Sequence, residues 1–300
     1  MSAHSVAISH NAALAGRIFA VHDARNQSGL TPEQIHLVES NHADFLRGGA
    51  ALAPADKERF AEIDARLSAL SVQFGHNVLA ATSAWVLELG PEDLAGLLPA
   101  TCEAAVGRAA AKGQVGRYHF TLDRNDYESF LTFSQRLDLR EKLWRAFTDR
   151  CNGGLHDNWP IIAETLALRR ERAVLLGYAD HAHYALEDSM AHDPAAATDL
   201  MRKLWEPGKG RAAEETAELQ ALIDAEGGSF ALAPWDWRFY AEQVRRARYA
   251  LDGAAVSAHL RLDAARQAAF DTAARLYGLS FTRRADIAGF HPDMSTLQSR

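Results

Sequence analysis

The sequence has little cysteine and no long apolar run. Cys102 and Cys151 are its only cysteines, and they lie far apart without C-x-x-C spacing. This argues against a disulfide scaffold and a cysteine zinc site, and favours reduced thiols. No stretch approaches the roughly eighteen apolar residues of a membrane span, and polar residues interrupt the N-terminal run that a secretory signal would need. We therefore predict a cytoplasmic protein without a membrane partner.

Lysine is also scarce, and positive charge is mostly arginine. The net charge is -7, and only five residues are lysine. Nucleic-acid-binding domains are usually basic, so we predict no nucleic-acid partner. The aromatic and arginine residues that alternate between Trp235 and Tyr249 could form a stacking platform for single-stranded nucleic acid. The acidic whole favours the other interpretation, in which core aromatic residues lie beside a charged helix face.

The familiar catalytic motifs are missing. The sequence contains no G-x-S-x-G, P-loop or G-x-G-x-x-G, and none of its thirteen histidines is followed by glutamate or lies four residues from another. His181 and His183, with nearby acidic residues, could suggest a metal site, but residues i and i+2 of a helix point to different faces. We interpret His183 with Glu187, and Asp188 with His192, as surface i,i+4 pairs. We therefore predict no catalytic or metal-binding residue in this chain.

Helical periodicity is what the sequence does contain. Thr31-Pro32-Glu33-Gln34 predicts a helix start with a capping box. A longer helix is predicted from Ala55, because its apolar residues recur at threes and fours. They are Phe60, Ile63, Leu67, Leu70, Phe74 and Val78. We predict two strands, at 85–89 and 119–122.

The second half of the sequence also predicts mainly helices. We predict that Asp138 caps a helix with Leu139 inside and Arg140 on a polar face. A cluster of arginines and glutamates at 164–172 is interpreted as a salt-laced outer face. Pro207-Gly208 should kink or break the helix that starts at residue 193. A last strand, at 279–282, has no obvious partner.

The residues also carry a resemblance. Thr121 to Ser134 reads TLDR-x-x-Y-x-x-FLTxS, 138–147 reads DLREKLWRAF, 157–178 reads DNxxIIAExxALRxERAxLLGY, and 234–242 reads PWDWRFYAE. These motifs resemble the bacterial peptidyl-dipeptidases (dipeptidyl carboxypeptidases) of the thimet-oligopeptidase family of zinc metallopeptidases. The resemblance covers almost the whole chain, and PWDWRFYAE favours this branch over the oligopeptidases.

The resemblance implies a mainly α fold, the multi-helix N-terminal lobe of a two-lobed zincin-type peptidase with a few short strands. Residues 1–115 would form an N-terminal helical region, and 116–300 the start of the catalytic domain. The family's zinc-binding H-E-x-x-H helix would lie C-terminal to the matching region. We therefore expect zinc in the full-length family member and none bound by this chain, which would be an inactive fragment by itself.

The resemblance further implies short peptides as substrates, from which C-terminal dipeptides are released. The 234–242 segment would border the substrate channel, so Trp235, Asp236 and Tyr240 are predicted to contact peptide. A truncated lobe would expose an apolar face and self-associate through it. The alternative function is a non-catalytic helical module that binds peptides or proteins.

Overall fold

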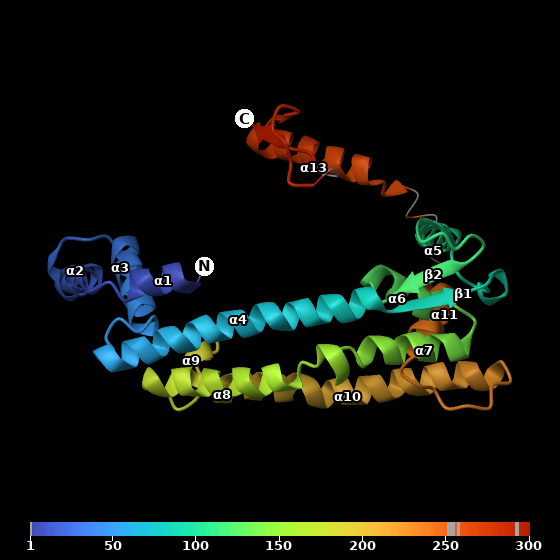
Figure 1. Cartoon of the computed structure of the whole chain (residues 1–300), viewed down its shortest axis with the longest axis horizontal. Coiled ribbons are helices and arrows are strands. Elements are labelled where there is room, and N and C mark those ends of the chain that lie inside the picture. Colours follow the sequence, from blue (N-terminus) through green and yellow to red (C-terminus); the bar gives the residue numbers. More distant parts are fainter. Residues whose placement is uncertain (1, 251–255, 257–258, 292–293) are drawn as a thin grey trace. The chain divides into compact units, whose positions relative to one another are not determined.

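The computed structural model describes residues 2–250, 256, 259–291 and 294–300, and its fold is mainly α-helical, as predicted (Figure 1). The described residues form two compact units, Met1–Tyr240 and Ala241–Arg300. The helices of the first unit are α1 (Ser2–Ser9), α2 (Ala12–Ala24), α3 (Pro32–Arg47), α4 (Pro54–Ala84), α5 (Pro99–Ala111), α6 (Arg124–Phe133), α7 (Leu137–Thr148), α8 (Trp159–Leu175), α9 (His181–Leu186) and α10 (Pro194–Ala225). The boundary between the units falls within α11 (Trp237–Tyr249).

The start of α3 follows the predicted capping box. Thr31 Oγ1 accepts a hydrogen bond from the backbone N–H of Gln34 at 3.3 Å, and Gln34 Oε1 accepts one from the N–H of Thr31 at 2.9 Å. The long helix α4 buries the predicted Phe60, Ile63 and Leu70 and packs along α8.

The two predicted strands form an antiparallel hairpin, β1 (Val86–Leu89) with β2 (Tyr118–Thr121). Their alternate side chains enter a core with α6 and α7. Its fully buried members include Leu87, Phe120, Phe130 and Leu143. The hairpin spans the predicted boundary between residues 115 and 116, and that division of the chain stays a prediction.

The structure corrects local predictions made for this part of the chain. No side chain caps the start of α7. Asp138 lies within the first turn and is bound by Arg136 at 2.8 Å, a pairing that lowers the pKa of its carboxyl. The helix α10 continues through Pro207, so the predicted break is absent, and the kink predicted as its alternative stays a prediction.

The second unit contains α13 (Leu262–Tyr277) and a small antiparallel sheet. The strand predicted near residue 281 is present as β3 (Phe281–Arg283), and it does have a partner, β4 (Leu297–Ser299). This pairing could not be predicted from the sequence, because β4 has only three residues. None of the helices described combines the length and apolar character needed to cross a membrane.

Candidate functional site

Of the predicted contact residues, Asp236 is the most deeply buried. It lies in the turn that leads into α11, and its Oδ1 accepts a hydrogen bond from Arg140 Nη2 at 2.6 Å. The two side chains are only 1% and 2% exposed. The Asp236 carboxylate therefore joins α7 to the start of α11 through a buried ion pair.

Other groups hold this pair in place. Arg140 Nη1 donates to the backbone carbonyl of Ser134 at 2.7 Å, and the guanidinium lies 4.3 Å from the ring centroid of Phe239. The second oxygen of Asp236 accepts from the N–H of Ala233 at 3.3 Å. The prediction that Arg140 lies on a polar helix face is wrong. A buried arginine is compatible with the core only because a carboxylate compensates its charge.

The other two predicted residues differ in exposure. Trp235 is partly exposed, its ring meets that of Trp144 edge to face at 5.5 Å, and Arg145 lies 5.0 Å above it. Tyr240 is only 6% exposed, and burial raises the pKa of its hydroxyl. Peptide contact by Trp235, Asp236 and Tyr240 stays a prediction, and Trp235 is the one of the three that keeps an accessible surface.

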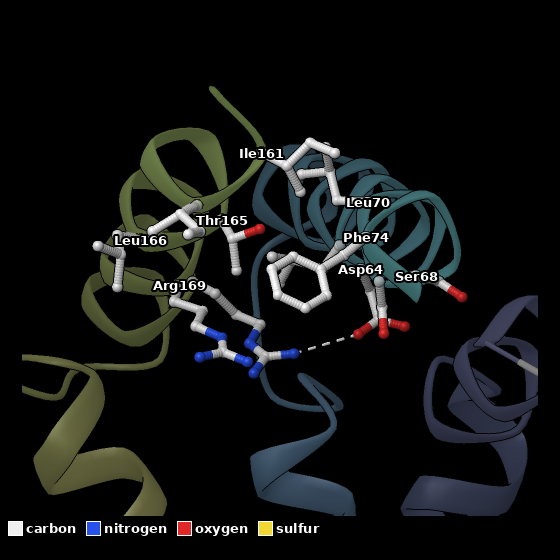
Figure 2. A pocket seen from close by; sticks show the side chains of 12 residues that line it. Asp64, Ser68, Leu70, Phe74, Ile161, Thr165, Leu166 and Arg169 are labelled. Atoms are coloured by element: carbon white, nitrogen blue, oxygen red, sulfur yellow. Dashed lines mark hydrogen bonds and ion pairs between the residues drawn. The ribbon is translucent and has the colours of Figure 1, made fainter. Parts of the chain in front are cut away.

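A groove of about 570 Å³ lies elsewhere, between α4 and α8 (Figure 2). Sequence reasoning did not identify it. Residues of both helices line it, and they are Asp64, Leu67, Ser68, Leu70, Ser71, Phe74, Ile161, Ile162, Thr165, Leu166, Arg169 and Arg172.

Ion pairs between the helices frame this groove. Arg59 binds Glu171 and Arg66 binds Glu164, each at 2.6 Å. These hydrogen bonds lower the pKa values of both glutamates. Because the earlier residue of α4 pairs with the later residue of α8, the two helices run antiparallel. The predicted salt-laced face is therefore present, but it faces a neighbouring helix as well as solvent.

The charges inside the groove do not balance. Asp64 pairs with Arg172 at 3.2 Å, and Figure 2 shows the Arg169 side chain beside that pair. Arg169 itself forms no hydrogen bond or ion pair with any residue that the structure describes. The two arginines also lower the pKa of the nearby His181, after burial as the main cause. One end of the groove thus carries an uncompensated positive charge.

The residues described do not fit a zinc site. No three histidine, cysteine, aspartate or glutamate side chains among them lie close enough together to hold a metal ion. Near His181, His183 Nδ1 lies 2.9 Å from Asp180 Oδ1, so the predicted pairing with Glu187 is wrong. Glu187 instead binds Arg47 at 2.8 Å. No catalytic step is therefore assigned to a metal held by this chain.

Comparison with known proteins agrees with the resemblance. Residues 130–298 match the family model described as peptidase family M3. The chain is 37% identical over 287 residues to a dipeptidyl carboxypeptidase of Salmonella typhimurium, covering 95% of this chain and 42% of that protein. It is 33% identical over 278 residues to oligopeptidase A of the same organism, covering 91% and 41%.

A more distant similarity is limited to part of the chain. The mitochondrial intermediate peptidase of Neurospora crassa is 33% identical over 141 residues, which is 45% of this chain and 18% of that protein. The chain spans about 42% of the length of the dipeptidyl carboxypeptidase that it matches.

Proposed function

The chain belongs to peptidase family M3, and from this we propose that it is the helical part of a zinc peptidase that releases dipeptides from the C-termini of short peptides. The 37% identity to a dipeptidyl carboxypeptidase, against 33% to an oligopeptidase A, supports this branch. The segment 234–242, PWDWRFYAE, supports it at the level of motif.

The zinc chemistry belongs, in this proposal, to polypeptide outside the 300 residues. No histidine here stands in an H-E-x-x-H motif, and this motif supplies two zinc ligands and the general base in such peptidases. The 300 residues by themselves would then bind no zinc and cleave no peptide. The cytoplasmic location and the absence of nucleic-acid and membrane partners remain parts of the same proposal.

The source DNA beyond codon 300 tests this proposal directly. We expect an H-E-x-x-H motif and a later glutamate ligand there, in frame or shifted, and zinc-dependent dipeptide release by the full-length product. Amidation of the substrate's C-terminus should abolish that release, whereas an internal cleavage would tolerate it. A clean stop followed by unrelated sequence, or dipeptide release by the 300-residue chain alone, would contradict the proposal.

The alternative is a non-catalytic module that binds peptides, and the groove between α4 and α8 favours it. Its volume of about 570 Å³ falls in the range of small-ligand sites. This function would be supported if the 300 residues bind peptide and unfold cooperatively, while the DNA downstream encodes no zinc motif.

Self-association is a further part of the proposal. Four large apolar side chains of α10 are each at least 60% exposed, and spacings of one and four residues place them on one side of the helix. They are Leu200, Met201, Leu204 and Trp205. An apolar surface of this kind is typical of an interaction site, so we expect the isolated chain to bind hydrophobic dyes or to associate with itself.

A further inference from the structure

We propose that the groove between α4 and α8 binds the C-terminal residue of a peptide, with the terminal carboxylate on Arg169 and an apolar side chain along the groove. The inference rests on the proposed function only in its choice of a peptide as the ligand. The groove's own charge and apolar lining supply the rest of the argument.

The positive charge of Arg169 favours an anionic ligand. Asp64 already compensates Arg172 at 3.2 Å, and the nearest acidic residues of α8, Glu164 and Glu171, are bound by arginines of α4 at 2.6 Å. No hydrogen bond or ion pair joins Arg169 to an acidic group in the described part of the chain. A guanidinium offers two parallel N–H donors that match a carboxylate.

A second donor near the same end also lacks a partner. Nε of Arg172 is buried and makes no hydrogen bond within the residues described. Buried donors are nearly always satisfied. This end of the groove therefore offers hydrogen-bonding capacity that the chain does not use.

The apolar lining of the groove favours an apolar group next to the anionic group of the ligand. Leu166 is 59% exposed and Phe74 is 40% exposed, above the buried Leu70 and Ile161. An apolar ligand group lying on Leu166 and Phe74 would remove this surface from water, which is favourable.

The spacing favours a C-terminal residue over an acidic side chain. Leu166 and Arg169 are three residues apart on one helix, which places their Cβ atoms about 5–6 Å apart. In a C-terminal apolar residue, the carboxylate and the side chain branch from the same carbon. One residue can therefore reach both positions, whereas an aspartate or glutamate would need a separate apolar neighbour.

The test measures binding of an N-acetylated tripeptide ending in leucine to the 300-residue chain by titration calorimetry. The same peptide with a C-terminal amide is the probe for the carboxylate. Arg169→Gln is the variant, and Arg170→Gln is the matched control, because Arg170 is exposed on the same helix and does not line the groove. Urea unfolding confirms that both variants fold.

We expect the wild-type chain to bind the acid more tightly than the amide. Arg169→Gln should weaken binding of the acid by about tenfold to a hundredfold, the usual effect of losing a hydrogen bond to a charged group. Binding of the amide should be unchanged, and Arg170→Gln should behave as wild type.

Three results would overturn the proposal. They are equal binding of acid and amide, equal losses in the two arginine variants, and no detectable binding of the acid at millimolar concentration. Failure of the groove proposal can be distinguished from failure of the proposed function. A full-length product that cleaves peptides while the groove binds none would refute only the groove, and tight binding by a protein without peptidase activity would refute only the enzyme.

Discussion

Replacing Asp236 with asparagine should remove a large part of the chain's stability. The substitution keeps the shape of the side chain but removes the negative charge opposite Arg140, whose side chain is 2% exposed. Arg140 would keep the Ser134 carbonyl and the Phe239 ring as partners, but neither cancels a full charge. Leaving one member of a buried pair uncompensated costs about 3–5 kcal/mol, against a typical total stability of about 5–15 kcal/mol.

Urea unfolding followed by tryptophan fluorescence measures this loss, because Trp144 and Trp235 are in contact beside the pair. With a slope near 3 kcal/mol per molar urea, the midpoint should fall by about 1–2 M. A double variant, Arg140→Met with Asp236→Leu, should recover most of the loss, because it removes both charges together.

Arg66→Gln is the control for this experiment. It breaks a pair of similar length, 2.6 Å, whose side chains are 50% and 41% exposed. Water stabilises the remaining charge there, so the midpoint should barely move. If Asp236→Asn and Arg66→Gln shift the midpoint equally, the Arg140–Asp236 pair is not buried in solution and the reasoning fails.

Three further experiments test other parts of the structure. Gly96→Ala should destabilise the chain much more than Gly153→Ala. Both positions have positive φ, but at Gly96 the new Cβ would also collide with the backbone carbonyl oxygen of Phe133, whereas at Gly153 it would meet open space. Similar urea midpoints for the two variants would contradict this. Leu204→Lys should reduce hydrophobic-dye binding and self-association. The control Ala213→Lys lies on the opposite side of α10, about half a turn away, and should leave both unchanged. Equal effects of the two variants would exclude the apolar face of α10 as the site of self-association. Burial and a neighbouring imidazole lower the pKa of His42. On acidification the unfolded chain therefore takes up this proton before the folded chain does, and stability should fall as the pH drops below the ordinary histidine pKa of about 6.5. His42→Asn should lessen that fall in the urea midpoint, and an unchanged pH dependence would refute the assignment.

Local sequence signals predicted much of the fold. The capping box at Thr31 depends on residues three apart, and the structure contains both of its hydrogen bonds. The strands β1 and β2 were predicted from short apolar runs closed by glycine or polar residues. Such signals are contained within one element, so no knowledge of the neighbours is needed to read them.

The predictions that the structure corrects concern contacts between residues far apart in the sequence. Arg140 follows Leu139 in an amphipathic helix and looks like a solvent-facing residue by its period. Its burial is decided by Asp236, which lies 96 residues away. The pairing of β3 with β4 has the same character, because a three-residue strand carries almost no periodic signal of its own.

The groove between α4 and α8 could not be predicted from the sequence for the same reason. Arg169, Arg170 and Arg172 are equivalent in composition, and only the position of α4 distinguishes them. Arg172 finds Asp64 across the helix pair, Arg170 lines no groove, and Arg169 lies in the groove without a carboxylate. The sequence predicts a charged cluster on α8, but it does not show which of these arginines lies in a groove without a partner carboxylate. For this reason the comparison of Arg169 with Arg170 tests the packing as well as the ligand: if the two variants differ in acid binding, the difference comes from the position of α4.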